Sequence, residues 1–439
     1  MKQYETYKDS SIPSIGTIPN SWRVVPIKYV LEQSANGIKI GPFGSTLTGK
    51  VSPANQVKVY GQWNVIGKDF SAGKNYVSED TYQELESYWI HPNDILISMM
   101  GTVGKCAIIP KGVAKGIMDS HIVKVRLDET IILPQFFYYV YDKDGSNVVI
   151  SQIQRDRRGS IMDGLNSTLI KSFIIPLPPL SEQQDIVYFL DEKVNMIDAT
   201  IAEKEQMLED LKAYRSAIIS EAVTKGLDKN VEMKDSGIEW CGYIPIHWQV
   251  LKIGYIFQNL DYLRQPISSE NRERNNPQYE YYGASGVIDK IDSYNVNDKV
   301  LLIGEDGANL VSRTLPLISK AEGKFWVNNH AHILKPISSD YDYMAFLLET
   351  ADYTNYITGS AQPKLSQEKL SSVKLPVPPI EEQKQIAKKL ICIVPLIDKS
   401  LIEIEKIIKD LKSYKSSLIT EAVTGKIDLR DWKPKEEKV

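Results

Sequence analysis

Cysteine is scarce in this sequence, with only Cys106, Cys241 and Cys392 among 439 residues. Three widely spaced cysteines exclude a disulfide scaffold and a cysteine-rich zinc module, and they are typical of a protein from a reducing cytoplasm. No apolar run reaches the ~18–20 residues that cross a bilayer. The first residues, MKQYETYKDS, contain no apolar core of a signal peptide. We therefore expect a cytoplasmic protein without membrane contact.

An excess of positive charge is also missing, because 52 Lys and Arg residues stand against 56 Asp and Glu residues, a net charge of −4. A strongly basic coat for nucleic acid is thereby excluded, so any contact with nucleic acid has to come from local patches. Hydrophobic residues make up 42% of the chain and charged residues 25%, which is typical of a well-packed soluble protein. A chain of this length holds about two to four domains.

Catalytic and metal-binding motifs are missing as well. Gly104-Lys105 resembles the end of a phosphate-binding loop, but the positions that need Gly and Ser or Thr hold Met99 and Cys106. His330 and His332 are spaced to share one face of a strand, but no cluster of carboxylates or cysteines accompanies them. We expect no catalysis, no metal and no cofactor in this chain.

Instead, the chain contains a long internal repeat. Residues 177–228 align without a gap with residues 377–428, at a constant offset of 200, and 22 of the 52 aligned positions are identical. Each copy begins with a Pro-Pro pair and ends with the run Glu-Ala-Val-Thr. Chance would produce only a few identities, so the sequence indicates a duplication.

A second, shorter repeat opens each half of the chain. Residues 8–27 align with residues 234–253 at an offset of 226, with Lys-Asp-Ser, Ile-Pro and a tryptophan in common. The blocks between the repeats, roughly 28–175 and 254–375, share little sequence. One frame with two different inserts suggests one task performed twice on different targets.

The long repeat is predicted to be helical. From Leu190, apolar residues step by four and three along the chain, which is the heptad pattern of a coiled coil. The alternative is an amphipathic helix on a globular core. Because both helices belong to one chain, antiparallel pairing within the chain is favoured over parallel pairing between two chains. Antiparallel pairing would place the two variable blocks at opposite ends of the helices. Pro395 is expected to kink or restart the second helix. The predicted interface residues are Ile197, Ile201, Leu208, Leu211, Ile218, Ile397, Leu401, Ile404, Ile408, Leu411 and Leu418.

These patterns predict an α+β protein: two mixed α/β modules separated by two long antiparallel helices, with an internal pseudo-two-fold duplication. We divide the chain into the first module (1–176), the first helix (177–228), the second module (229–376), the second helix (377–428) and a C-terminal tail (429–439).

Polar, basic and aromatic residues gather in loops of both modules. Arg, Lys, Asn and Gln have the geometry to contact phosphates and base edges, although any one cluster could equally be a solvated loop. The candidate DNA contacts are Gly41, Phe43, Ser45, Lys105, Arg155, Arg157, Arg158 and Ser160 in the first module, and Arg272, Arg274, Tyr281, Tyr282, Ser285, Asn329, His330, Gln362 and Lys364 in the second.

Together these motifs resemble the specificity subunit of type I restriction-modification systems, along essentially the whole chain. The resemblance rests on Lys234–Trp240 with Ile244-Pro245 and Trp248, on Pro176–Gln183, on Gly359–Ser366 and on the paired helices. The first half departs from the pattern, because it has Gly159–Asn166 where the second half has the Gln-Pro-Lys-Leu-Ser run.

The resemblance implies two target recognition domains, each binding one half of a bipartite site in double-stranded DNA. The helices would set the spacing and dock two methyltransferase subunits, joined by two motor-nuclease subunits, and S-adenosylmethionine, ATP and magnesium would belong to these partners. Two alternatives remain: a DNA-binding regulator that acts without modification subunits, and an adaptor whose modules bind protein or glycan.

Overall fold

The computed structural model describes residues 2–34, 36–54, 56–100, 103–142, 145–157, 165–272, 277–359 and 363–433. Packing divides the chain into two compact units. The first comprises Met1–Glu205 and Lys406–Val439, and the second comprises Gln206–Glu405. Each unit thus contains one half of each long helix, whereas the division proposed from the sequence cuts the chain at the helix ends and stays a prediction.

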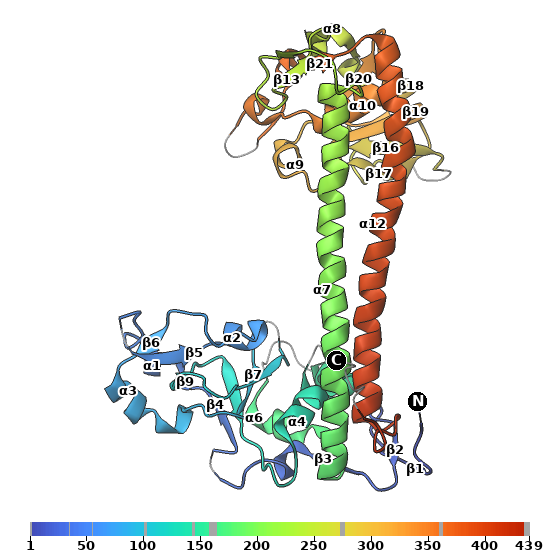
Figure 1. Cartoon of the computed structure of the whole chain (residues 1–439). Coiled ribbons are helices and arrows are strands. Elements are labelled where there is room, and N and C mark those ends of the chain that lie inside the picture. Colours follow the sequence, from blue (N-terminus) through green and yellow to red (C-terminus); the bar gives the residue numbers. More distant parts are fainter. Residues whose placement is uncertain are drawn as a thin grey trace. The chain divides into compact units, whose positions relative to one another are not determined.

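The frame consists of the two pairs of repeated segments, 8–27 with 234–253 and 177–228 with 377–428, and the longer pair forms two long helices (Figure 1). Helix α7 spans Leu180–Lys225 and helix α12 spans Ile380–Val423, and each begins directly after a Pro-Pro pair. Pro395 lies inside α12, which continues through it, so the expected restart does not occur. Its neighbours Val394 and Ile397 are buried, and their packing offsets the backbone hydrogen bond that a proline cannot donate.

Within each unit the two helices run antiparallel, as predicted. In the first unit, Asp198 pairs with Lys415 at 2.6 Å and Glu205 pairs with Lys412 at 2.8 Å, so residue numbers rise along α7 as they fall along α12. In the second unit, the C-terminal end of α7 and the start of α12 share one apolar cluster. The predicted interface positions are buried or half-buried: Ile197, Ile201, Leu208, Leu211, Ile218, Ile397, Leu401, Ile404, Ile408, Leu411 and Leu418.

The first unit builds its module from short strands. A four-stranded sheet has the order β4-β10-β7-β8, a three-stranded sheet has the order β6-β5-β9, and two ribbons pair β1 with β2 and β3 with β11. The strands are β1 Tyr7–Asp9, β2 Thr17–Pro19, β3 Arg23–Pro26, β4 Ile38–Ile40, β5 Val57–Tyr60, β6 Tyr76–Val77, β7 Ile95–Ser98, β8 Cys106–Ile108, β9 Gly116–Met118, β10 Ile122–Val125 and β11 Ile174–Leu177. The helices are η1 Ile27–Tyr29, α1 Gly44–Leu47, α2 Gln62–Gly67, α3 Glu79–Glu84, η2 Glu86–Tyr88, α4 Pro134–Tyr141, α5 Asn147–Arg157 and α6 Ser167–Ser172.

The second unit is built around a six-stranded sheet of order β15-β20-β18-β19-β16-β17, with ribbons β12-β13 and β14-β21. The strands are β12 Met233–Asp235, β13 Tyr243–Pro245, β14 Gln249–Lys252, β15 Phe257–Asn259, β16 Tyr279–Gly283, β17 Gly286–Ile291, β18 Val296–Gly304, β19 Ile318–Val327, β20 Ala331–Pro336 and β21 Lys374–Val377. The helices are α8 Ile253–Ile256, η3 Asp261–Leu263, α9 Gly307–Ser312, α10 Tyr341–Thr350, η4 Thr354–Tyr356 and α11 Gln367–Ser372. Both faces of the sheet are covered, by separate apolar clusters.

The repeated segments form the same substructure in both units. The ribbon β1-β2 corresponds to β12-β13, and β3-β11 corresponds to β14-β21, with matching antiparallel registers. In each unit a tryptophan that follows the first ribbon donates its indole N–H to a glutamate in the first turn of a long helix, Trp22 to Glu182 and Trp248 to Glu382. The two sequence repeats therefore meet in space.

The C-terminal segment packs onto the first unit as far as residue 433. The amide of Asp428 donates to the carbonyl oxygen of Lys2 at 2.9 Å, and Lys2 pairs with Asp431 at 2.6 Å. The Trp432 ring packs edge-on against Phe189 of α7, with centroids 5.4 Å apart. The described part of the predicted tail is thus a packed part of the fold.

Candidate nucleic-acid interface

Loops from distant parts of the sequence meet at one edge of the six-stranded sheet. Gly304, at the end of β18, pairs with Ala331, at the start of β20, so the segments that follow β18 and precede β20 lie together. The Glu305 amide donates to the His330 carbonyl oxygen at 2.8 Å, and the Gly307 amide donates to the Pro363 carbonyl oxygen at 2.7 Å. A Cβ atom at Gly307 would lie 2.8 Å from that carbonyl oxygen, so only glycine allows this approach.

Glu305 organises the positive charge at this edge. One carboxylate oxygen lies 3.1 Å from Arg264, and the other lies 3.3 Å from Lys364. Arg264 also donates to the carbonyl oxygen of Asn329 at 3.2 Å. The Lys364 side chain is 43% exposed and Glu305 is 19% exposed, so Lys364 presents a positive charge at the surface, near Asp306, which is 48% exposed.

A buried His–Asp pair supports these loops from beneath. His332 Nε2 donates to the Leu365 carbonyl oxygen at 2.7 Å, and His332 Nδ1 lies 2.6 Å from Asp261 Oδ2. Asp261 also accepts from the Ile333 amide at 2.8 Å. Burial by itself would raise the pKa of Asp261, but the bonds from His332 and Ile333 and the charge of nearby Arg264 outweigh it and lower that pKa.

The corresponding edge of the first unit is built in the same way. Ser98, at the end of β7, pairs with Ile122, at the start of β10, and the Met99 amide donates to the His121 carbonyl oxygen at 3.2 Å. Gly41 lies against this turn so closely that a Cβ atom there would come within 1.7 Å of the Asp119 carbonyl oxygen. Burial raises the pKa of the Asp119 carboxyl.

Large apolar side chains are exposed in the loops around this first edge. Phe43 is 85% exposed, Met100 is 56% exposed and Trp63 is 50% exposed. The Met100 amide donates to the Gln62 side chain at 3.1 Å, which joins two of these loops. Exposed apolar groups beside polar loops are typical of surfaces that contact a partner.

Several predicted contacts fall at these two edges. In the second unit, Ser285, Asn329, His330 and Lys364 lie in or next to the loop cluster, and Ser285 and Asp306 line the same small pocket of about 160 Å³. In the first unit, Gly41, Phe43 and Ser45 follow β4, and the Lys105 carbonyl oxygen accepts from the Ser98 amide at 2.9 Å. Their contact with DNA stays a prediction.

Three of the predicted DNA contacts, Tyr281, Tyr282 and Arg272, instead make contacts within the second unit. The Tyr281 and Tyr282 rings are 1% and 6% exposed, which contradicts a direct role in DNA contact. They are consecutive residues of one strand, so they point to opposite faces of the sheet, and both faces are covered. Arg272 pairs with Asp289 at 3.0 Å and lies over the Tyr281 ring, 4.3 Å from its centroid, which leaves its side chain 15% exposed.

The remaining predictions are not placed by the structure. Arg158, Ser160, Arg274 and Gln362 lie outside the described residues, and Arg155 and Arg157 lie on α5 at positions where no side chain is described. One exposed residue at the first edge, His121, was not among the candidates. The signal for it was present: Asp119-Ser120-His121 matches Asn328-Asn329-His330 as an Asx-x-His pattern.

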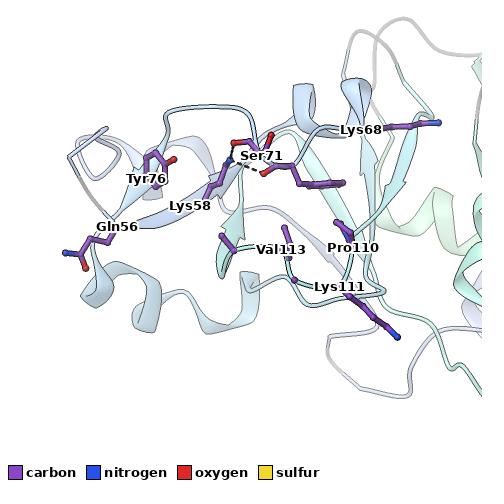
Figure 2. A pocket seen from close by; sticks show the side chains of 11 residues that line it. Gln56, Lys58, Lys68, Ser71, Tyr76, Pro110, Lys111 and Val113 are labelled. Carbon is purple, nitrogen blue, oxygen red and sulfur yellow. Dashed lines mark hydrogen bonds between the residues drawn. The ribbon is translucent and has the colours of Figure 1, made fainter. Parts of the chain in front are cut away.

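A separate pocket of about 530 Å³ in the first unit is lined by Lys58, Lys68 and Lys111 (Figure 2). The Lys58 ammonium donates to the carbonyl oxygens of Phe70 at 2.9 Å and Ser71 at 2.6 Å. Lys68 pairs with Asp142 at 3.1 Å. Because two of its three lysines are already bound within the protein, this pocket is a weaker candidate than the two sheet edges.

Among the described residues, no group of three His, Cys, Asp or Glu side chains is arranged to hold a metal ion. No helix in the described ranges is long and apolar enough to cross a membrane.

Known proteins match this chain in both of its halves. The family model described as type I restriction modification DNA specificity domain matches twice, at residues 37–210 and 245–410. A Methanocaldococcus jannaschii protein, provisionally assigned as the MjaX type I specificity subunit, is 26% identical over 454 residues, covering 97% of this chain and 98% of the relative. The MjaVIII specificity subunit of the same organism is 24% identical, covering 78% of this chain and 81% of the relative.

Solved structures show the same fold. A chain from a study of complex assembly in a type I restriction-modification system superposes with a TM-score of 0.69 at 15% identity, over 93% of this chain and 99% of that one. The HsdS subunit from Thermoanaerobacter tengcongensis superposes with a TM-score of 0.50 at 15% identity, over 93% and 98% of the two chains. Because the family model covers both halves of the sequence and the fold agrees, this chain belongs to the family of type I restriction-modification DNA specificity subunits.

Proposed function

We propose that each unit of this specificity subunit binds one half of a bipartite site in double-stranded DNA, and that the paired helices set the distance between the half-sites. The observation that carries this proposal is one frame holding two different loop edges. Trp22 with Glu182 and Trp248 with Glu382 repeat the frame, whereas the loops at the sheet edges differ. Two different sets of loops, held by equivalent repeated segments, are suited to binding two different half-sites.

The local charge supports this function better than the total charge does. The chain is net negative, so it has no general attraction for the phosphate backbone. Lys364 and Arg264 both pair with Glu305 at the second edge, and the more exposed Lys364 presents a positive charge where the loops meet. Phosphate contacts of this kind set the register of the protein, and base contacts choose the sequence.

The chemistry of the complex would belong to partner subunits. Two methyltransferase subunits would dock on the helices and methylate adenine with S-adenosylmethionine, which requires flipping the base out of the duplex. Two motor-nuclease subunits, using ATP and magnesium, would complete the complex in the cytoplasm. The present chain would contribute binding and positioning, with no cofactor of its own.

The test is methylome sequencing of a host that expresses this chain with its modification subunits. We expect adenine methylation at one bipartite motif, and exchange of residues 28–175 for the same block of another specificity subunit should change one half of that motif only. Methylation without sequence preference, or none, would contradict the proposal. Specific binding by the isolated chain, with no effect of modification subunits, would identify a regulator, and no DNA affinity in any assembly would identify an adaptor.

A further inference from the structure

We propose that His121 and His330 are equivalent residues that each donate an imidazole N–H to a DNA phosphate, one in each half-site. This inference rests on the proposed function, because it names a contact of the same interface. The two residues lie in the variable blocks, at an offset that matches neither repeat of the frame, and the fold places their shared Asx-x-His pattern at equivalent positions.

The backbone around the two histidines is built alike. The His121 amide donates to the Asp119 side chain at 2.8 Å, and the His330 amide donates to the Asn328 side chain at 2.8 Å. The histidine carbonyl oxygens accept from Met99 and Glu305, the residues that directly follow the paired strands β7 and β18. Each histidine therefore sits in the same Asx turn at the same corner of its sheet.

Both imidazole rings are about half exposed. The His121 side chain is 54% exposed and the His330 side chain is 46% exposed. His121 Nδ1 lies 3.3 Å from the Ser120 hydroxyl and 3.7 Å from Asp119, and His330 Nδ1 lies 3.7 Å from Asp306. His330 Nδ1 is buried without a hydrogen-bond partner among the described residues, so the exposed part of that ring lies away from Nδ1. In both units an acidic residue flanks Nδ1.

The surroundings of the two histidines differ. Around His121 the exposed side chains are apolar, as Phe43 and Met100 show. Around His330 they are polar and charged, as Asn329, Lys364 and Asp306 show. Half-sites of different sequence share their phosphates and not their bases. A histidine that recurs at two otherwise different edges is therefore suited to contact phosphate, which both half-sites share.

The experiment uses the complete complex with its modification subunits and a duplex that carries the bipartite site. His121→Ala and His330→Ala preserve the backbone bonds of the Asx turns, because those bonds involve only the histidine amide and carbonyl groups. A hydrogen bond to a charged acceptor corresponds to roughly a 10- to 100-fold change in affinity, so we expect each variant to weaken binding by about 10-fold or more. The sequence preference should stay unchanged, because the lost contact is to a phosphate and not to a base.

His91→Ala is the matched control. The His91 side chain is 52% exposed, and it contacts Arg126, the residue that follows β10, so it lies at the opposite end of the same strands. Its removal should leave DNA affinity unchanged. His330→Gln retains an N–H donor and should recover part of the affinity, which separates a lost contact from a disturbed loop.

The outcomes distinguish the two proposals. Specific binding by the wild-type complex with no loss in His121→Ala and His330→Ala would overturn the histidine contacts and leave the proposed function intact. A changed sequence preference in either half-site would also overturn the phosphate role, because it would indicate base contact. Failure of the wild-type complex to bind any bipartite site would instead contradict the proposed function.

Discussion

The indole N–H of Trp22 donates to the carboxylate of Glu182 at 2.9 Å, which joins the opening segment of the chain to the first turn of α7. The same bond forms between Trp248 and Glu382 at 3.1 Å. Both tryptophans are fully buried, so the carboxylate also satisfies an N–H that water does not reach. This bond joins the repeated segment that opens each half of the chain to the first turn of a long helix.

Trp248→Phe should destabilise the second unit. The change keeps most of the ring volume and removes the donor to Glu382, so we expect a loss of about 1–3 kcal/mol in the free energy of unfolding, measured by urea titration. Tyr262→Phe is the control in the same unit, because Tyr262 is 77% exposed and its change should stay within about 0.5 kcal/mol. Equal effects of the two substitutions would refute the role of the indole bond.

A buried glutamine next to each of these glutamates is predicted to be equally important. Gln383 donates to the Pro378 carbonyl oxygen and accepts from the Asp340 amide, both at 2.9 Å, and Gln183 makes the corresponding bonds to Pro178 and Leu133. Gln383→Leu leaves buried backbone groups unsatisfied and should cost about 1–3 kcal/mol of unfolding free energy.

The control for Gln383→Leu lies two residues further along the same helix. Gln385 is exposed, so Gln385→Leu should have almost no effect on stability. Hydrogen exchange at the Asp340 amide, at the start of α10, provides a local readout. Unchanged protection of that amide in Gln383→Leu would show that the side-chain bond does not hold this loop.

The stability of the second unit should depend on pH through Asp261. Its pKa is lowered in the folded protein, because the bonds from His332 and Ile333 outweigh the effect of burial, so the unfolded state binds more protons. The stabilisation is therefore complete well above pH 4 and is lost as the pH falls through 4 toward the lowered value. Asp261→Asn should cost about 3 kcal/mol near pH 7, and its urea midpoint should fall less than that of the wild type between pH 5 and pH 3.

The ion pairs between the helices should contribute little energy individually. Arg215 pairs with Asp398 at 2.5 Å, and the equivalent residues Lys415 and Asp198 pair at 2.6 Å. The Arg215 and Asp398 side chains are 34% and 43% exposed, so water screens them, and a double-mutant cycle should give a coupling of about 0.5–1 kcal/mol that decreases with salt. A coupling above about 2 kcal/mol would show that the pair is far less screened than its exposure implies.

Lengthening the helices should lengthen the DNA target. One heptad inserted into α7 near Leu208, and another at the facing level of α12, would add about 10 Å at 1.5 Å per residue, or about three base pairs. Methylome sequencing should then find the same two half-sites separated by a longer gap. An unchanged gap would contradict the spacing function of the helices.

Much of the frame could be predicted because its signals are local and repeated. The Pro-Pro pairs and the heptad of apolar residues act within one helix, and the 200-residue offset predicts that α7 and α12 use the same positions. The restart expected at Pro395 does not occur, since the helix continues through it, whereas the expected kink stays a prediction. The packing of Val394 and Ile397 outweighs the low helix propensity of proline at this position.

The binding edges were harder to predict, because each is assembled from segments that are far apart in the chain. Tyr281 and Tyr282 resembled surface aromatics beside basic residues, but the second face of their strand is also covered, and Arg272 is held by Asp289 across that face. For His121 the sequence offers only the short Asx-x-His pattern that it shares with His330, and the pairing of Ser98 with Ile122 and of Gly304 with Ala331 is needed to place the two histidines at equivalent corners.

The amino-acid sequence by itself determined the duplication, the two long helices and the family resemblance, since these follow from periodic patterns that neighbouring residues express without help from distant ones. Only the tertiary structure decided which loop residues share an edge, which aromatic rings are buried and which two histidines correspond. Those relationships depend on strand register and on the burial of both sheet faces, and both arise from contacts between residues far apart in the chain.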